Sequence, residues 1–192
     1  MNKQTILGID PGIAGTGLAV IALGSKVEVV ELASVRTLPA GRKARLRQAD
    51  DDAGRLRVIL TAVDDLIKRH RPMVVAYETP LGSKGARAAK SLAYVVGGVV
   101  TLGWSTDRAV MSVTPAEAKL AAANVKTASK RDVFDALTRR FDLDLPAAKV
   151  DREHALDALG VALAVVKTEF VLAALRAAPL RLRLVDAEGE LL

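Results

Sequence analysis

Two carboxylates stand where two apolar strands end. Asp10 ends a strand predicted for residues 5–10, Glu78 ends another predicted for residues 73–77, and a proline turn follows each of them. A carboxylate without a partner is costly at the end of a buried strand, so each acid either caps its turn or holds a cation. Asp-Pro-Gly is ordinary turn chemistry, and for Asp10 alone a turn role stays open. A second acid at the same kind of position favours a metal site.

A histidine and a third acid stand three residues apart near the C-terminal end of the sequence. His154 and Asp157 belong to a predicted helix with Asp151 as its N-cap, and their spacing places both on one face. Asp157 interrupts an apolar run and therefore needs a partner. Facing the two strand-end acids, this pair would complete a four-ligand site that is rich in oxygen. The alternative is that His154 only packs in the first helical turn.

An oxygen-rich site selects a hard cation, Mg²⁺ or Mn²⁺, rather than zinc. Two such ions can activate a water molecule and stabilise the leaving oxygen of a phosphodiester. The net charge of +6 favours an anionic partner, whereas an aromatic content of 3% excludes base stacking as the main mode of nucleic-acid binding. These features together indicate a metal-dependent nuclease.

Basic residues gather in three segments that could bind DNA. Lys130 and Arg131 open a helix, where cations oppose the helix dipole but strengthen the anion site formed by the exposed amides. We therefore predict a phosphate contact at this turn, although Asp132 and solvent could simply neutralise the two charges. A solvated linker is the alternative for the basic loop after the third strand. The DNA-binding candidates are Arg42, Lys43, Arg45, Arg47, Lys84, Arg87, Lys90 and Arg131.

The elements that must position these residues form an α/β pattern. Three strand-like segments open the chain, at 5–10, 16–23 and 26–35, and the Gly24-Ser25 turn makes the last two a hairpin. An amphipathic helix follows Asp50-Asp51-Asp52. The remaining predictions are strands at 73–77 and 109–113, a helix at 86–102, and helices opening at Thr114-Glu117, Ser129-Asp132 and Asp151.

Two packing questions stay open at this level. Gly97 and Gly98 in the helix at 86–102 permit a close helix approach, either within the core or at a subunit interface. In the helix after Ser129, the inward residues are Val133, Leu137 and either Phe134 or Phe141.

The composition bears on the compartment. The chain has no cysteine, which fits a reducing compartment, and the first residues lead into a strand without the pattern of a signal peptide. No apolar run is long enough for a membrane span. The expectation is a cytoplasmic protein without a membrane partner.

The ordered motifs resemble those of the RuvC-type Holliday junction resolvases. The similarity covers about residues 5 to 166 and is carried by Ile9-Asp10-Pro11-Gly12 with Gly15-Thr16-Gly17, by Tyr77-Glu78, and by His154-Ala155-Leu156-Asp157-Ala158-Leu159. The resemblance implies a ribonuclease-H-like mixed five-stranded sheet flanked by helices, a homodimer, and paired symmetric nicking of four-way DNA junctions. It also implies metal binding at Asp10, Glu78, His154 and Asp157, with Mg²⁺ or Mn²⁺ as two ions per site, and lysines near the scissile phosphate at Lys119 and Lys130.

The sequence departs from this family in two places. The loop after Glu78 has Leu81 and no aromatic wedge, and residues 168–192 form an extension beyond a nuclease domain at 1–167, with a strand and turn expected at 181–189. Both departures would suit a viral or otherwise divergent member. The missing wedge favours a broader nuclease that cuts forks or flaps. The third alternative is a non-nuclease, either an ATPase of the related actin-like fold or an inactive DNA-binding relative.

Overall fold

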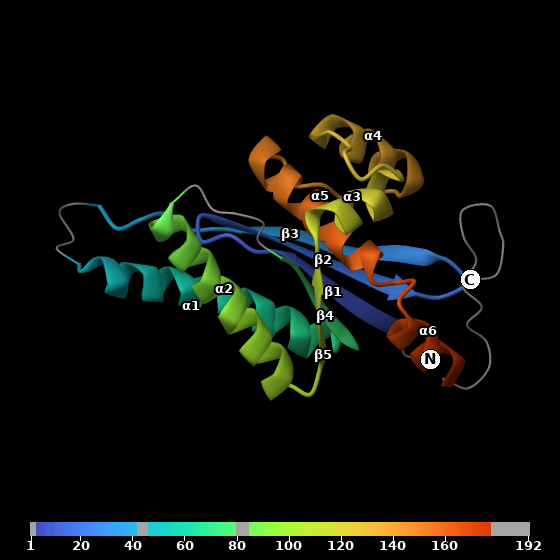
Figure 1. The fold of residues 1–192 in the computed structure, drawn as a ribbon, viewed down its shortest axis with the longest axis horizontal. Coiled ribbons are helices and arrows are strands. Elements are labelled where there is room, and N and C mark those ends of the chain that lie inside the picture. The colour runs from blue at the N-terminus through green and yellow to red at the C-terminus, as the bar shows by residue number, and fades with distance from the viewer. Residues whose placement is uncertain (1–2, 42–45, 80–84, 178–192) are drawn as a thin grey trace.

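A five-stranded sheet with helices on both faces forms the protein (Figure 1). The computed structural model describes residues 3–41, 46–79 and 85–177, so Arg42, Lys43, Arg45, Lys84, Leu81 and the predicted strand and turn at 181–189 lie outside the described part. The elements are β1 (Gln4–Asp10), β2 (Gly15–Leu23), β3 (Val27–Arg36), α1 (Gln48–His70), β4 (Val74–Glu78), α2 (Ala86–Ser105), β5 (Ala109–Val113), α3 (Pro115–Ala123), α4 (Lys130–Arg140), α5 (Lys149–Ala164) and α6 (Glu169–Ala177).

The sheet is mixed, as the sequence predicts. Its strand order is β3-β2-β1-β4-β5, in which β1, β2 and β3 are antiparallel neighbours while β4 runs parallel to both β1 and β5. The parallel pairing of β1 with β4 brings the carboxyl ends of these two strands to the same edge of the sheet.

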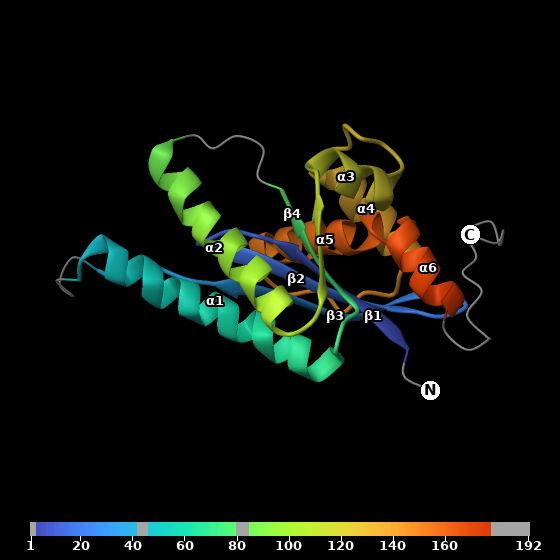
Figure 2. The same cartoon turned by 60° about the horizontal axis from the view of Figure 1, so that its bottom comes forward.

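The alternation of side chains along the strands separates two apolar cores. Leu7 and Ile9 face one core with α1 and α2, whereas Ile6 faces the other with α3, α4 and α5. Figure 2 shows α1 and α2 lying side by side on one face, opposite α3, α4 and α5. Because the side-chain period of a strand is two, Asp10 shares the α5 face with Ile6, and Glu78 shares it with Ala76.

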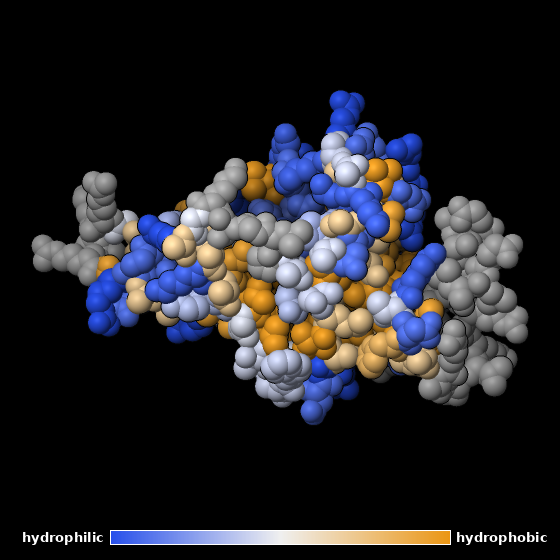
Figure 3. Space-filling view, in the orientation of Figure 1, coloured by the Kyte–Doolittle hydropathy of each residue, from blue (hydrophilic) through white to orange (hydrophobic). Residues whose placement is uncertain are grey.

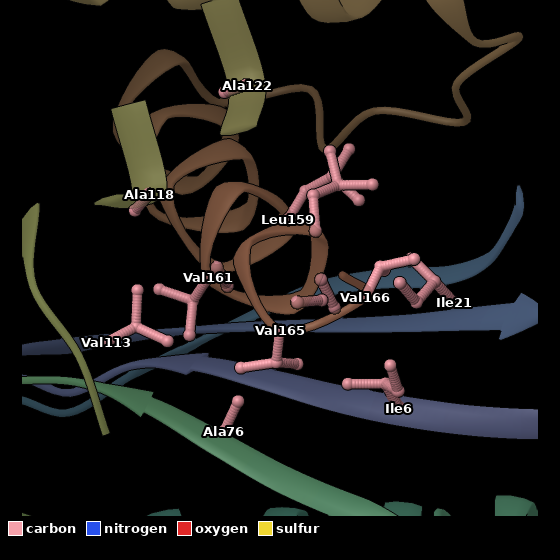
Figure 4. Packing of buried hydrophobic residues seen from close by; sticks show 14 of the residues in the cluster. Ile6, Ile21, Ala76, Val113, Ala118, Ala122, Leu159, Val161, Val165 and Val166 are labelled. Carbon is pink, nitrogen blue, oxygen red and sulfur yellow. The ribbon is translucent and has the colours of Figure 1, made fainter. Parts of the chain in front are cut away.

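Helix α5 lies at the centre of the second core, between the sheet and α3 (Figure 4). It approaches the sheet so closely that a Cβ at Gly8 would stand 2.3 Å from the Ala158 carbonyl oxygen, and one at Gly17 only 1.8 Å from the carbonyl oxygen of His154. On the far side of α5, a Cβ at Gly160 would lie 3.1 Å from the carbonyl oxygen of Ala118 in α3. These glycines let the helix backbone rest directly on its neighbours.

Several local predictions are confirmed and one is wrong. Thr114 with Glu117 forms the predicted capping box at the start of α3, and Ser129 with Asp132 forms a second one at the predicted start of α4. The prediction that Asp151 is an N-cap is wrong, because α5 begins at Lys149 and Asp151 lies in its first turn.

The two packing questions are also answered. Gly98 packs on α1, with Leu60 Cδ1 2.7 Å from an ideal Cβ, whereas Gly97 has no neighbour within 4 Å of such an atom. Of the two phenylalanines, Phe141 packs against the core and Phe134 remains 39% exposed.

Helix α6 follows the predicted nuclease domain. Val171 of this helix is fully buried in the core around α5, so the packed core includes the first part of the region beyond residue 167. None of the helices in the described ranges is long and apolar enough to cross a membrane.

The close packing of α5 predicts opposite effects for two glycine-to-alanine substitutions. Gly17→Ala should lower the free energy of unfolding by about 3 kcal/mol, the upper end of the usual cost of overpacking, because the clash is with backbone. Gly54→Ala in α1 meets nothing within 4 Å and should raise it by about 0.5–1 kcal/mol through helix propensity. Urea unfolding of both variants measures these changes, and equal effects would contradict the packing.

Candidate active site

The two strand-end acids lie next to each other at the carboxyl edge of the sheet. Ile9 and Tyr77 are partners in the parallel β1–β4 register, so Asp10 and Glu78 follow at adjacent positions. Both residues are partly buried, and both lie on the face that α5 covers. The sequence prediction that these acids share one site is therefore consistent with the strand register.

His154 reaches the same edge from the N-terminal half of α5. Its Nδ1 donates a hydrogen bond to Asp10 Oδ2 at 2.7 Å, and its Nε2 lies 2.8 Å from the place of a Cβ at Gly15. Glycine at this position leaves room for the imidazole ring. The hydrogen bond to Asp10, followed by the charge of that carboxylate, raises the pKa of His154 above its usual range.

Asp157 lies one helical turn further along α5, beside a small pocket. The pocket has a volume of about 140 Å³, and its polar lining comes from Glu78, Asp157, Lys119 and Lys130. Burial raises the pKa of Glu78 to about 7, with further contributions from the charges of Asp10 and Asp157. Burial also raises the pKa of Asp157 to about 6, again with a contribution from Asp10. The charges of Lys119 and Lys130 oppose the shift at Glu78, and that of Lys130 opposes the shift at Asp157, without cancelling either.

Lys130 reaches from α4 to α5 and places a positive charge beside the acids of that helix. Its Nζ donates a hydrogen bond to Glu153 Oε2 at 2.8 Å and lies 3.7 Å from Asp157 Oδ2. Asp132 Oδ2 accepts hydrogen bonds from the Ser129 backbone and side chain, whereas Lys130 pairs with Glu153. The sequence reasoning missed Glu153, whose only signal was its position immediately before His154.

The donor set fits a hard cation, but the side chains are not closed around one. No three histidine, cysteine, aspartate or glutamate side chains within the described ranges are arranged so that they could share a metal ion. Asp10 is instead turned to His154, and Asp157 lies near Lys130. A cluster of buried carboxylates with two raised pKa values is nevertheless a place where a divalent cation would relieve repulsion.

A buried arginine holds the turn that follows Asp10. Arg55 is 9% exposed, and its guanidinium donates hydrogen bonds to Thr37 Oγ1 at 2.8 Å and to the Ile13 carbonyl at 3.2 Å. Two acids of the same helix, Asp51 and Asp52, lie 4.0 and 3.9 Å from its Nη1. Sequence reasoning missed Arg55, although its place four residues before the buried Ile59 puts it on the apolar side of α1.

The candidate DNA-binding residues that the structure describes each contact another group. Arg47 pairs with Asp50 at 2.8 Å, and Arg131 lies 3.7 Å from Asp135. On α2, Arg87 donates a hydrogen bond to Gln48 at 2.6 Å. The Lys90 Nζ lies 5.5 Å from the centre of the Tyr94 ring. Exposed pairs of this kind contribute little stability, so these cations remain able to exchange partners for phosphate.

Comparisons with known proteins point to one family. A family model described as crossover junction endodeoxyribonuclease RuvC matches residues 6–165. A protein of that description from Frankia alni is 35% identical over 176 residues, covering 90% of this chain and 83% of its own. Another from Mycolicibacterium vanbaalenii is 34% identical over 160 residues, covering 82% and 76%.

Two solved structures are similar in fold. The structure of Thermus thermophilus RuvC in complex with a Holliday junction substrate has a TM-score of 0.69 and 26% identity, covering 84% of this chain and 92% of the other. The yeast mitochondrial Holliday junction resolvase has a TM-score of 0.62, covering 84% and 77%, and its 12% identity supports the likeness of fold alone.

Because the pKa of Glu78 is raised, replacing its carboxyl group should stabilise the fold at high pH but not at low pH. The folded pKa is about 7 and lies above the unfolded one, so the metal-free protein loses stability as pH rises from about 4.5 to 7. Glu78→Gln should therefore increase the free energy of unfolding at pH 8 and have no such effect at pH 4. Urea unfolding in EDTA at the two pH values measures the difference.

Glu117→Gln is the control with the opposite sign. The hydrogen bonds from the Thr114 backbone and side chain lower the pKa of Glu117, so its stabilising effect is present above its unfolded pKa and is lost in acid. This variant should lose stability at pH 8. A gain from Glu78→Gln that is equal at both pH values would contradict the electrostatic account of the pocket.

Proposed function

Because the chain belongs to the RuvC family of crossover junction endodeoxyribonucleases, we propose that it resolves four-way DNA junctions by paired, symmetric hydrolysis of two phosphodiester bonds. The observation that supports the proposal most is the meeting of acids from β1, β4 and α5 at one edge of the sheet, beside Lys119 and Lys130. Family membership argues against the ATPase alternative. A preference for forks or flaps is tested by comparing their cleavage with that of the four-way junction.

Four residues are proposed to hold the metal: Asp10, Glu78, His154 and Asp157. Metal dependence is a general property of this nuclease family. Oxygen donors favour Mg²⁺, or Mn²⁺ in its place, and we propose two ions per site. Bound ions of this kind activate a water molecule and stabilise the leaving oxygen.

The remaining residues of the site bind and orient the DNA strand. Lys130 lies 3.7 Å from Asp157, and Lys119 lines the same pocket, so both ammonium groups can contact a phosphate placed there. Such charges contribute most as negative charge develops on the phosphate oxygens. The hydrogen bond between His154 and Asp10 orients both side chains toward the same edge. Outside the pocket, exposed cations such as Arg47 and Arg87 hold the backbone through charge.

A homodimer is proposed to present two such sites, with the outer face of α2 as its interface. This face is apolar and open: Tyr94 is 41% exposed, Trp104 is 68% exposed, and Gly97 has no neighbour. Figure 3 shows pale and orange side chains where Figure 1 places α2 and β5, whereas blue ones cover the α4 side. Two-fold symmetry is the simplest way to make paired cuts.

Removal of any of the three acids should abolish cleavage without weakening DNA binding. Asp10→Asn, Glu78→Gln and Asp157→Asn each remove a proposed metal ligand, yet loss of a negative charge cannot weaken attraction to DNA. Synthetic four-way junction, fork, flap and plain duplex, each incubated with Mg²⁺, with Mn²⁺ and with EDTA, provide the measurement. EDTA should stop cleavage and Mg²⁺ should restore it.

Asp65→Asn, a charge-matched change on the exposed side of α1, is the control and should cut normally. An acid variant that cuts at the wild-type rate would remove its residue from the site. Faster cleavage of the fork or flap than of the junction would support the broader nuclease instead.

The interface predicts that Gly97→Glu produces a monomer, because a charge would be buried between two copies of α2. Light scattering should give twice the chain mass of 20.3 kDa for the wild type and the single mass for this variant. Gly54→Glu is the matched control, since Gly54 is also an open helical glycine, and it should remain dimeric. A monomeric wild type, free and on junction DNA, would exclude the proposed dimer.

A further inference from the structure

A second, larger hollow adjoins the catalytic pocket between α4 and α5. Its volume is about 640 Å³, within the range of pockets that hold a small organic ligand. Lys130 and Asp157 line both hollows, so the groove continues directly from the proposed catalytic site. A DNA strand bound in the catalytic pocket can therefore extend into this groove.

An aromatic ring lies on the wall of this groove. Phe134 is 39% exposed, while its neighbours on α4, Val133 and Leu137, are buried in the core at 6% and 0% exposure. The core is thus filled without Phe134, and its ring remains available to a ligand. An open aromatic face stacks readily with a nucleobase, since every base has a π-face.

Cations share the groove lining with the ring. Arg131, Lys149 and Arg152 line the groove together with Lys130. Arg131 and Lys149 have side chains 90% and 82% exposed, and their acidic partners Asp135 and Glu153 lie 3.7 and 3.9 Å away. Exposed pairs at these distances are weak, so the cations can exchange them for phosphate. The groove thus combines an aromatic face with four cations, set against the acids Asp135, Glu153 and Asp157 of the same lining. An aromatic face and cations are the two features that bind single-stranded nucleic acid.

We propose that the α4–α5 groove holds one unstacked nucleotide of the cleaved strand, with its base on Phe134 and its flanking phosphates against Arg131, Lys149 and Arg152. This inference rests on the proposed function and adds to it a contact at the branch point. The loop after Glu78 carries no aromatic residue, so Phe134 supplies an aromatic surface from a different element of the fold. A base that has left the stack is most easily obtained at a branch point, where pairing is already interrupted.

The test is a double-mutant cycle that combines a protein variant with variants of the DNA. Junctions are made with one abasic residue placed in turn at each of the four nucleotides around the branch point of one strand. The affinity of wild type and Phe134→Ala for each junction is measured by fluorescence anisotropy in EDTA. Phe134→Ala should bind the intact junction on the order of tenfold more weakly, as expected for the loss of one stacked base. At one abasic position, the affinity of the wild type should fall by the same factor. The affinity of Phe134→Ala for that junction should equal its affinity for the intact one.

Two further variants separate stacking from folding. Phe134→Trp keeps an aromatic face and should retain wild-type affinity, whereas Phe134→Leu keeps an apolar side chain and should behave like Phe134→Ala. Phe170→Ala is the matched control, because Phe170 is a 50% exposed aromatic on α6 and lies outside the groove lining; it should bind normally. Thermal unfolding of all four variants should give midpoints close to that of the wild type.

The outcomes distinguish this inference from the proposed function. If Phe134→Ala binds every junction as wild type does, or if abasic residues weaken both proteins equally at every position, the groove does not hold a base. These results stand even when wild type fails to cut the junction with Mg²⁺, since the binding cycle is carried out in EDTA. Failure of cleavage alone would instead overturn the proposed function.

Discussion

The direct contact between the backbone of α5 and the sheet is the constraint on which the site depends. At Gly8 and Gly17 there is no room for a side chain between strand and helix. This proximity allows the His154 imidazole to reach Asp10 at 2.7 Å and places Asp157 beside the pocket that Glu78 lines. A bulkier residue at either glycine would move the helix, and with it two of the four proposed ligands. Packing and chemistry are therefore set by the same contact.

The site is electrostatically strained in the metal-free state. Burial raises the pKa values of Glu78 and Asp157 because it takes their charged forms out of water, and the charge of Asp10 adds to both shifts. Lys130 and His154 relieve part of the repulsion through their contacts with Asp157 and Asp10. What remains is the unfavourable free energy that a bound cation would remove. Strain of this kind is common where a protein keeps a site ready for a ligand at some cost in stability.

Three parts of the surface differ in character, and the first two adjoin each other. The carboxyl edge of β1 and β4 carries the acids, the groove between α4 and α5 carries exposed cations and Phe134, and the outer face of α2 carries the open apolar residues. Arg55 links the first of these to the loop after β3, since it binds both Thr37 and the carbonyl of Ile13. The turn after Asp10 is thereby fixed by a residue from a different layer of the structure.

The sequence by itself determined the five strands and the helices as far as α5, but it did not predict α6, and its four-ligand site remains a prediction. Local patterns were sufficient for the strands, since apolar runs ending in Asp10 and Glu78 defined two of them. The common face of the two acids follows from the observed strand register and core. The capping boxes at Thr114 and Ser129 were equally local, because their partners stand three residues apart.

Only the tertiary structure decided contacts between residues distant in the chain. It packs Gly98 on α1 while the adjacent Gly97 stays open. It also pairs Lys130 with Glu153 and buries Arg55 against Thr37. In the structure α5 begins at Lys149, before Asp151, whose carboxylate lies 3.9 Å from Arg36 of β3. The Lys130–Glu153 pair and the start of α5 depend on how α5 packs against α4 and the sheet, whereas the contacts of Gly98 and Arg55 depend on how α1 packs against α2 and the loop after β3. No local pattern records these choices, because the partners come from different elements and meet only through packing.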